Sequence, residues 1–105
     1  MSRSVVVYLL QNKAVADTLK VQRKKFVKTK VYGELESVSG DEYFRAGQLG
    51  IKAKYMVSVF LYDYHDEQLC ELQGKRYLIY RTYNRKGTER IELYLAEEIQ
   101  HEDES

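Results

Sequence analysis

The side chains that could do chemistry in this sequence are few and scattered. His65, Asp66 and Glu67 would offer three metal ligands in a row, but adjacent residues rarely chelate one ion well, and no second cluster has ligand spacing. We therefore interpret these three residues as a solvated turn. Cys70 has no base or cationic neighbour in the sequence that would activate its thiol, so we expect it to fill a small apolar space.

The acidic C-terminal part does not supply a catalytic set either. Glu97 and Glu98 could mimic an acid-base pair, but they lead into an acidic tail at residues 99–105, which holds His101 and is expected to fray. The sequence has no phosphate-cradling glycine loop and no Ser-His-Asp pattern. The sequence therefore predicts a protein that is not an enzyme and that uses no metal or cofactor.

A run of positive charge at residues 20–30 is the strongest electrostatic feature of a chain whose net charge is only +1. No acidic residue interrupts this run. One interpretation is a long solvated hairpin arm or a disordered loop. The other is a basic arm that contacts phosphate or an acidic partner. Its basic residues are Lys20, Arg23, Lys24, Lys25, Lys28 and Lys30.

Most of the remaining sequence is typical of short β-strands. Apolar and polar residues alternate at residues 88–96, so Ile91, Leu93 and Leu95 are expected to face a core. The turn before this segment contains Gly87, at a position that favours a positive φ. The expected strands are residues 5–10, 31–38 with a bend at Gly33, 54–64, 69–72, 75–83 and 88–96, and residues 11–18 are expected to form a loop.

Length and composition set the size and class of the fold. The 105 residues suffice for one small domain, and about six short strands separated by turns suggest a small barrel or sandwich. A lone cysteine cannot form an internal disulfide and fits a reducing compartment. The apolar run at residues 5–10 is too short to cross a membrane. We expect one mainly β domain over residues 1–105, cytoplasmic in origin, with residues 1–30 as an arm region.

One stretch, residues 37–49, favours a short helix inserted between the second and third long strands. Gly40 ends the preceding strand, and the Asp41 carboxylate can accept the free amide hydrogens of a helix start. Gly47 and Gly50 are expected to end the helix after roughly two turns, because glycine weakens helices. An apolar side is offered by Tyr43, Phe44 and Leu49. Since so short a helix is marginal alone, it must pack on its own barrel or on another subunit.

The same stretch resembles a known family. The order Ser-Val-Ser-Gly-Asp-Glu-Tyr-Phe-Arg-Ala-Gly-Gln at residues 37–48 is similar to the middle segment of the head-tail joining proteins of tailed bacteriophages, which are also called head-closure or stopper proteins. A strong strand follows at residues 55–62, then Gly-Lys-Arg-Tyr-Leu-Ile at residues 74–79, and then a final hairpin. The resemblance covers roughly residues 32–98, and it depends on the order and spacing of these short motifs.

This resemblance implies a structural virion protein with a small β-barrel fold with long loops and no enzymatic activity. Members of the family form a homo-oligomeric ring below the portal and adaptor proteins of the DNA-filled head, and they offer a docking face for the tail. The ring retains packaged double-stranded DNA without sequence specificity. The implied location is the head-tail interface of the virion, after assembly in the host bacterial cytoplasm, with no membrane partner.

By the same resemblance, residues 39–51 form the segment that lines or closes the DNA channel. The residues that we assign to this gate are Ser39, Gly40, Asp41, Glu42, Tyr43, Phe44, Arg45, Ala46, Gly47 and Gln48. Gly40, Gly47 and Gly50 would then act as hinges. A simpler possibility is that this helix plugs one end of its own barrel.

Two further expectations concern assembly and the alternative function. Near-neutral charge and polar arms predict a protein that is mainly monomeric when free and assembles on its adaptor, because ordering the arms has an entropic cost. The alternative function is a monomeric cytoplasmic β-barrel that binds nucleic acid or another protein. Ten tyrosines and the basic run would suit that function, since barrels of this size use aromatic platforms and a positive groove.

Overall fold

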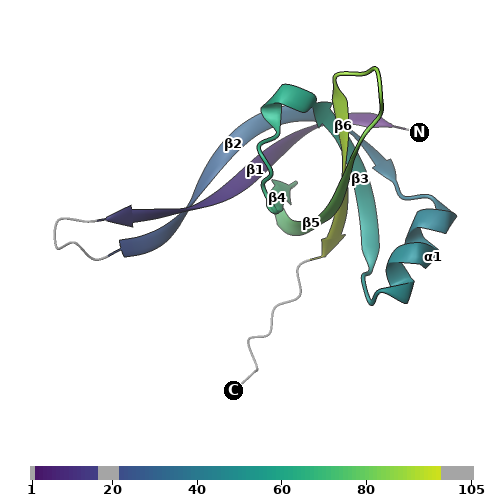
Figure 1. Ribbon diagram of the computed structural model, residues 1–105, viewed down its shortest axis with the longest axis horizontal. Coiled ribbons are helices and arrows are strands. Elements are labelled where there is room, and N and C mark those ends of the chain that lie inside the picture. Colours follow the sequence, from purple (N-terminus) through teal and green to yellow (C-terminus); the bar gives the residue numbers. More distant parts are fainter. Residues whose placement is uncertain (1, 17–21, 98–105) are drawn as a thin grey trace.

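The structure is a computed structural model that describes residues 2–16 and 22–97, with the side chains of residues 12–16 and 22–26 left out. It is mainly β. Six antiparallel strands close into a barrel, and one short α-helix lies between the second and third strands (Figure 1). The expected fold class is thus confirmed.

The strands follow the order β1-β2-β3-β6-β5-β4 around the barrel, and β4 closes it by pairing with β1. Closure satisfies the backbone hydrogen bonds of both edges, which an open sheet of this size would leave to solvent. The elements are β1 (Arg3–Ala16), β2 (Gln22–Ser37), α1 (Gly40–Gln48), β3 (Ala53–Phe60), the 3-10 turn η1 (Leu61–Asp63), β4 (Leu69–Leu72), β5 (Lys75–Asn84) and β6 (Arg90–Glu97).

The core fills the inside of the barrel with side chains from all six strands. In β6, Ile91, Leu93 and Leu95 are buried, as the alternating pattern predicted. Val57 and Val59 of β3 have no exposed surface at all. Each such side chain contributes roughly 1.5–3 kcal/mol when it is fully buried. The other core residues are Val7, Leu9, Val31, Leu35, Cys70, Leu72, Tyr77 and Ile79.

The end of β3 differs from the expected long strand. The strand stops at Phe60, and Leu61–Asp63 form η1. The Leu61 backbone N–H donates to the carbonyl of Glu89 at 2.7 Å, and the Tyr64 N–H donates to the carbonyl of Leu61 at 3.2 Å. These two bonds accompany the turn by which the chain leaves the hydrogen-bond ladder between β3 and β6. The hairpin between β5 and β6 agrees with expectation, because Gly87 has a φ of +84°.

β2 crosses β3 very closely at Gly33. A Cβ atom at this position would lie 2.8 Å from the carbonyl oxygen of Ser58 and 2.9 Å from a methyl group of Val57. Because the first of these atoms belongs to the backbone of β3, which is paired with β2 on one side and β6 on the other, it cannot move aside cheaply. Gly33 is therefore required by the close approach of the two strands.

We predict that Gly33→Ala lowers the free energy of unfolding by about 1–3 kcal/mol, because the added methyl group overpacks the barrel wall. Urea denaturation of the purified protein measures this change. Gly40→Ala is a matched control, since a Cβ at Gly40 has open space around it. Equal stability of the two variants would contradict the close approach.

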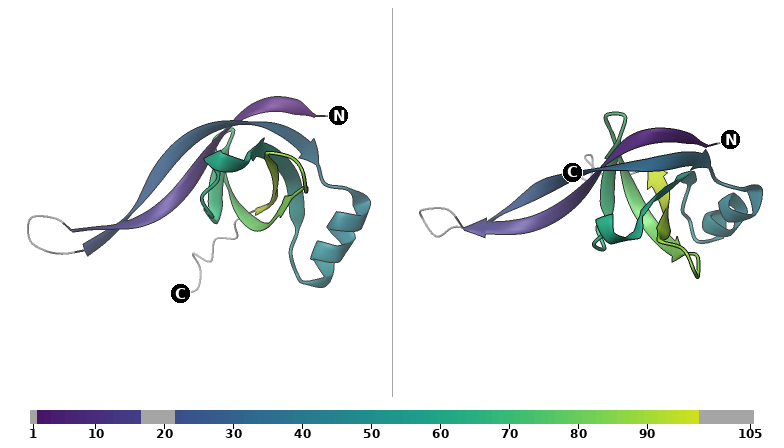
Figure 2. Two further views of the ribbon diagram at one scale, coloured as in Figure 1. Left: turned by 45° about the horizontal axis from the view of Figure 1, so that its top comes forward. Right: turned by 90° about the horizontal axis from the view of Figure 1, so that it is seen from above.

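The hairpin of β1 and β2 extends well past the barrel, as Figure 2 shows from two further sides. β1 pairs with β4 only at residues 7–10, and β2 pairs with β3 only at residues 33–37. We call residues 11–16 and 22–30 of this hairpin the arm. Within the described residues, residues 11–16 and 22–27 pair only with each other, and residues 28–30 pair only with residues 8–10 of β1.

The arm corrects two expectations. Residues 11–16 were expected to be loop, but they belong to β1 and pair with residues 22–27 of β2. For residues 22–30 the hairpin interpretation is confirmed and the disordered-loop interpretation is wrong. The reason is that pairing between the strands satisfies backbone N–H and C=O groups whatever the side chains are, so a polar composition does not prevent a strand.

Candidate functional site: the inserted helix and its attachment to the barrel

α1 begins directly after Ser39, whose Oγ accepts a hydrogen bond from the backbone N–H of Glu42 at 3.1 Å. Ser39 is therefore the N-cap, and the expected capping role of Asp41 is wrong. The extended backbone of Ser39 places its short hydroxyl beside the free amides of the first turn. Asp41 lies inside that turn, where its negative charge interacts favourably with the helix dipole.

The C-terminus of α1 is closed by two backbone hydrogen bonds. The N–H of Ile51 donates to the carbonyl of Ala46 at 2.9 Å, and the N–H of Gly50 donates to that of Gly47 at 3.0 Å. These two bonds form a Schellman motif, which requires a positive φ at the residue after the C-cap, and Gly50 has a φ of +79°. Gly47 lies within the helix, which continues to Gln48. Gly50 alone thus has the terminating role that the sequence suggested for both glycines.

The apolar side of α1 faces away from its own barrel. The sequence left open whether Tyr43, Phe44 and Leu49 pack on this barrel or on another subunit, and 49%, 68% and 76% of their surfaces are exposed. The buried residues of the helix are Glu42, 8% exposed, and Ala46, 3% exposed. The helix therefore contacts its barrel through a carboxylate and a small methyl group, and its aromatic side faces away.

The buried carboxylate of Glu42 is paired with two residues of β5. Arg81 Nη2 donates to Oε1 at 2.6 Å and Arg81 Nε donates to Oε2 at 3.1 Å, while the Tyr80 hydroxyl donates to Oε2 at 2.5 Å. A two-point contact of this kind between guanidinium and carboxylate is stronger and more directional than a neutral hydrogen bond. It fixes the rotation of α1 against the barrel.

An irregularity in β5 makes this arrangement possible. Ile79 pairs with Leu95 and Arg81 pairs with Tyr94, so Tyr80 is an extra residue without its own partner in β6. Such a bulge lets two successive side chains lie on one side of the sheet. Tyr80 and Arg81 consequently both reach Glu42, whereas Ile79 stays in the core.

Tyr94 of β6 completes the group that we call the Glu42 clamp, which comprises Glu42, Tyr80, Arg81 and Tyr94. The Arg81 Cζ lies 4.0 Å from the centroid of the Tyr94 ring, a favourable stacking distance. The Tyr94 hydroxyl donates to Glu92 Oε1 at 2.8 Å. Burial, followed by the Glu92 hydrogen bond, raises the pKa of Tyr94 to about 12.

The clamp perturbs the acid-base behaviour of its own members. The hydrogen bond from Arg81 is the main cause that holds the pKa of Glu42 below its usual value, against the opposing effect of burial. Burial and the hydrogen bond to Glu42 raise the pKa of Tyr80. Glu42 is therefore charged and Tyr80 protonated at neutral pH, which is the state that the geometry requires.

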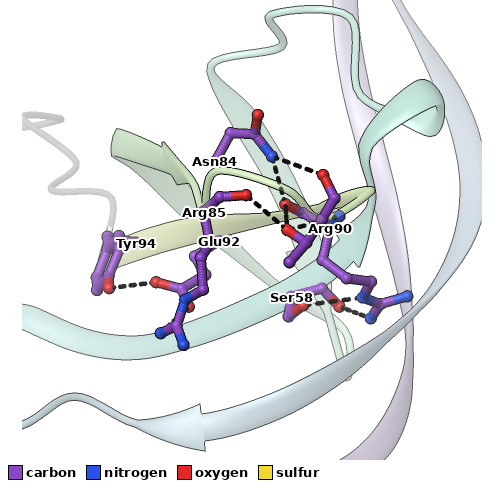
Figure 3. A network of polar contacts seen from close by, with 7 residues as sticks. Ser58, Asn84, Arg85, Arg90, Glu92 and Tyr94 are labelled. Carbon is purple, nitrogen blue, oxygen red and sulfur yellow. Dashed lines mark hydrogen bonds and ion pairs between the residues drawn. The ribbon is translucent and has the colours of Figure 1, made fainter.

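A shallow groove lies next to the clamp on the outer face of β2, β3 and β6. We call it the carboxylate groove, and its volume is roughly 450 Å³. Figure 3 shows the polar network along it, in which Arg90 donates to the carbonyl of Ser58 at 2.7 Å and Asn84 donates to the carbonyl of Arg90 at 2.7 Å. The lining residues are Ser2, Glu34, Glu36, Met56, Ser58, Arg85, Thr88, Arg90 and Glu92.

Among the basic residues of the arm, the structure describes the side chains of Lys28 and Lys30. Lys28 Nζ lies 2.9 Å from Glu71 Oε1 and 5.8 Å from the centroid of the Tyr8 ring. Lys30 lies 5.6 Å from the ring of Tyr32. Arg23, Lys24 and Lys25 are in β2 but their side chains are not described, and Lys20 lies outside the described residues.

The other candidate residues do not form a reactive site. The carboxylate of Glu67 is buried, at 5% exposure, and accepts the backbone N–H of His65 at 2.7 Å, so this turn is not solvated throughout as expected. Cys70 is fully buried, and burial raises its pKa to about 12. Glu97 pairs with Lys75 at 2.6 Å. Among residues 2–16 and 22–97, no group of three metal-ligating side chains occurs. Glu98 and His101 lie outside the described residues.

Sequence reasoning located the helix but missed Tyr80, Arg81 and Tyr94. One signal was present, because Ser39 followed three residues later by Glu42 is a capping-box pattern that marks a helix start. In that pattern the glutamate returns to the N-cap, whereas here it reaches β5 instead. The choice between these two partners depends on the bulge, which the sequence does not reveal.

We predict that Glu42→Gln lowers the free energy of unfolding by about 1–3 kcal/mol near neutral pH, because Arg81 loses its charged partner. The pKa of Glu42 is lower in the folded than in the unfolded protein. Its stabilisation is therefore present above the unfolded pKa and is lost as the pH falls through the folded pKa.

Urea denaturation at a series of pH values tests this prediction, with Glu36→Gln as the control for an exposed carboxylate. The stability curves of wild type and Glu42→Gln should converge in acid. Parallel curves would mean that Glu42 and Arg81 do not stabilise the fold as an ion pair.

Comparisons with known proteins add no assignment, since no protein-family model and no curated protein matches this chain. In the part of the chain that the structure describes, no helix is long and apolar enough to cross a membrane.

Proposed function

We propose that this protein is a structural head-closure subunit of a tailed bacteriophage, and that α1 is the gate segment of a ring-shaped DNA channel. The observation that carries the proposal is the outward aromatic face of α1. Tyr43 and Phe44 are exposed on a helix that is too short to be stable alone. The Glu42 clamp accounts for how the helix is held, and it leaves both rings available to a neighbouring subunit.

The charge on the outer side of α1 suits a segment beside packaged DNA. Glu42 is neutralised by Arg81, and the exposed charges are those of Asp41 and Arg45, which offset each other. A surface of this kind does not bind phosphate strongly, because affinity for DNA grows with the number of phosphates that are neutralised. The gate could thus block DNA by bulk and still allow ejection.

The position of α1 argues against the simpler possibility of a plug in its own barrel. A plug would bury its aromatic residues against the core, whereas Tyr43 and Phe44 face away from it. The core cluster contains no residue of α1. Movement of α1 therefore requires opening of the clamp and of the small contact at Ala46, with no loss of the barrel core.

In this proposal the protein is not an enzyme. It forms a homo-oligomeric ring on the portal and adaptor proteins, provides a docking face for the tail, and contacts double-stranded DNA without sequence specificity. Its place is the head-tail interface of the virion, and the free subunit in the host cytoplasm is mainly monomeric. Genes for portal, capsid and tail proteins beside its own gene would support this assignment, and their absence would count against it.

The alternative function is a monomeric barrel that binds nucleic acid, and the basic arm is the observation that favours it. The aromatic residues of the hairpin reinforce that function only weakly, because Lys28 and Lys30 lie over one ring face of Tyr8 and of Tyr32, although Tyr32 is 68% exposed. Stacking platforms for bases need free ring faces. We therefore keep the head-closure function as the better supported of the two.

We predict that phage heads assembled with a Tyr43→Ala/Phe44→Ala protein lose packaged DNA, because the rings no longer meet across the channel. The thermal stability of the isolated subunit should change little, since exposed side chains contribute within about 0.5 kcal/mol. DNA retained in purified heads is the quantity to measure.

Tyr62→Ala/Tyr83→Ala is the matched control, as both of these tyrosines are exposed on other elements. Heads carrying the control should retain DNA as the wild type does. The gate assignment fails if both double variants retain DNA equally, or if the α1 variant unfolds the subunit.

A further inference from the structure

Charge is divided unequally between the arm and the rest of the molecule. Within residues 11–30, basic residues outnumber acidic ones by six, so the remainder of the chain carries a net charge of −5 because the total is +1. The arm projects from one side of the barrel (Figure 1). The molecule therefore has a positive extension and a negative body.

Both strands of the arm also have an outer edge that pairs with no further strand among the described residues. Beyond residue 10 on β1, and before residue 33 on β2, neither strand has a second partner among the described residues. Two-stranded hairpins are marginally stable by themselves, and open edges are sites where further chains attach. The arm thus needs a surface to lie on.

The register of the arm adds an electrostatic cost. Lys13 and Lys25 are directly opposite each other in the pairing of β1 with β2. Like charges in this position destabilise a strand pair. A partner that carries carboxylates would remove this repulsion, whereas an apolar or basic partner would not.

The carboxylate groove has the chemistry of such a partner. Three glutamates and two arginines line it. Arg85 lies 3.8 Å from Glu92, whereas Arg90 donates to the neutral carbonyl of Ser58 and keeps its charge. Glu34 accepts the hydroxyl of Ser4 at 3.2 Å, and Glu36 is exposed. Among the described residues neither Glu34 nor Glu36 forms an ion pair, so the groove keeps a small net negative charge.

The groove and the arm also lie at different ends of the same strand. Glu34 and Glu36 are near the C-terminal end of β2, next to α1, whereas the arm contains its N-terminal end (Figure 1). A contact between two unlike patches at opposite ends is a head-to-tail contact. Repeated in several copies, it closes into a ring when the rotation per subunit permits.

We propose that the arm of one copy docks on the carboxylate groove of the next copy, so that the positive charge of the arm meets Glu34 and Glu36 of the neighbour. This inference rests on the proposed function, because it names the contact by which the ring would be built. It also brings the arm of each copy near the start of α1 of the next, because Glu36 lines both the carboxylate groove and the pocket at residues 37–39.

The test is a charge swap, measured by sedimentation equilibrium of the purified full-length protein at high concentration and low salt. Lys24→Glu/Lys25→Glu should weaken self-association about tenfold, since several exposed ion pairs are replaced by repulsions. Glu34→Lys/Glu36→Lys should weaken it equally. A chain with all four changes should associate like the wild type, and added salt should reduce these differences.

Lys52→Glu/Lys54→Glu is the matched control, because both lysines are exposed and lie outside the arm. It changes the net charge as much as the arm variant does, so it should leave association unchanged. Circular dichroism of each variant checks folding, and Lys24→Ala/Lys25→Ala replaces the arm variant if that one misfolds.

The inference is overturned if the four-residue variant does not regain association, or if the arm variant associates normally. It is also overturned if the arm variant loses binding to a short DNA duplex while its self-association is unchanged, because the arm would then be a nucleic-acid surface. DNA retention in heads distinguishes failure of the docking contact from failure of the gate assignment. Heads that stay closed with the arm variant would reject the docking contact and leave the proposed function standing.

Discussion

The contact between Glu42 and Arg81 is the interaction on which the position of α1 depends. A carboxylate that is 8% exposed must be paired, because burial of an isolated charge is very costly. The pairing satisfies Glu42, holds the short helix against the barrel wall, and frees Tyr43 and Phe44 from that task. An aromatic face turned to the outside is thus a consequence of a charged contact on the inside. This is the physical basis of the proposal that the helix is a gate.

The barrel could be predicted from the sequence because its signals are local. Ile91, Leu93 and Leu95 alternate with polar residues over one strand, and Gly87 marks the turn before it. The arm could not be predicted in the same way. Residues 11–16 have no strand pattern, and they are extended because β2 lies beside them. The structure of the arm therefore comes from pairing between distant residues, which composition does not report.

The site shows the same division between local and distant information. Glycines located the helix, but the sequence left open whether its apolar side packs on its own barrel or on another subunit, and only the structure shows Tyr43 and Phe44 exposed. The partners of Glu42 come from β5, about forty residues later, and both reach it only because Tyr80 forms a bulge. Neither the bulge nor the resulting clamp has a signature in the sequence.

A double-mutant cycle on Glu42 and Arg81 tests this account most directly. The free energies of unfolding of the wild type, Glu42→Gln, Arg81→Gln and the double variant give the coupling between the two side chains. We predict a coupling of at least about 1 kcal/mol, with the amide hydrogens of α1 exchanging faster in each single variant. A coupling near zero, with unchanged exchange in α1, would show that something other than this ion pair holds the helix.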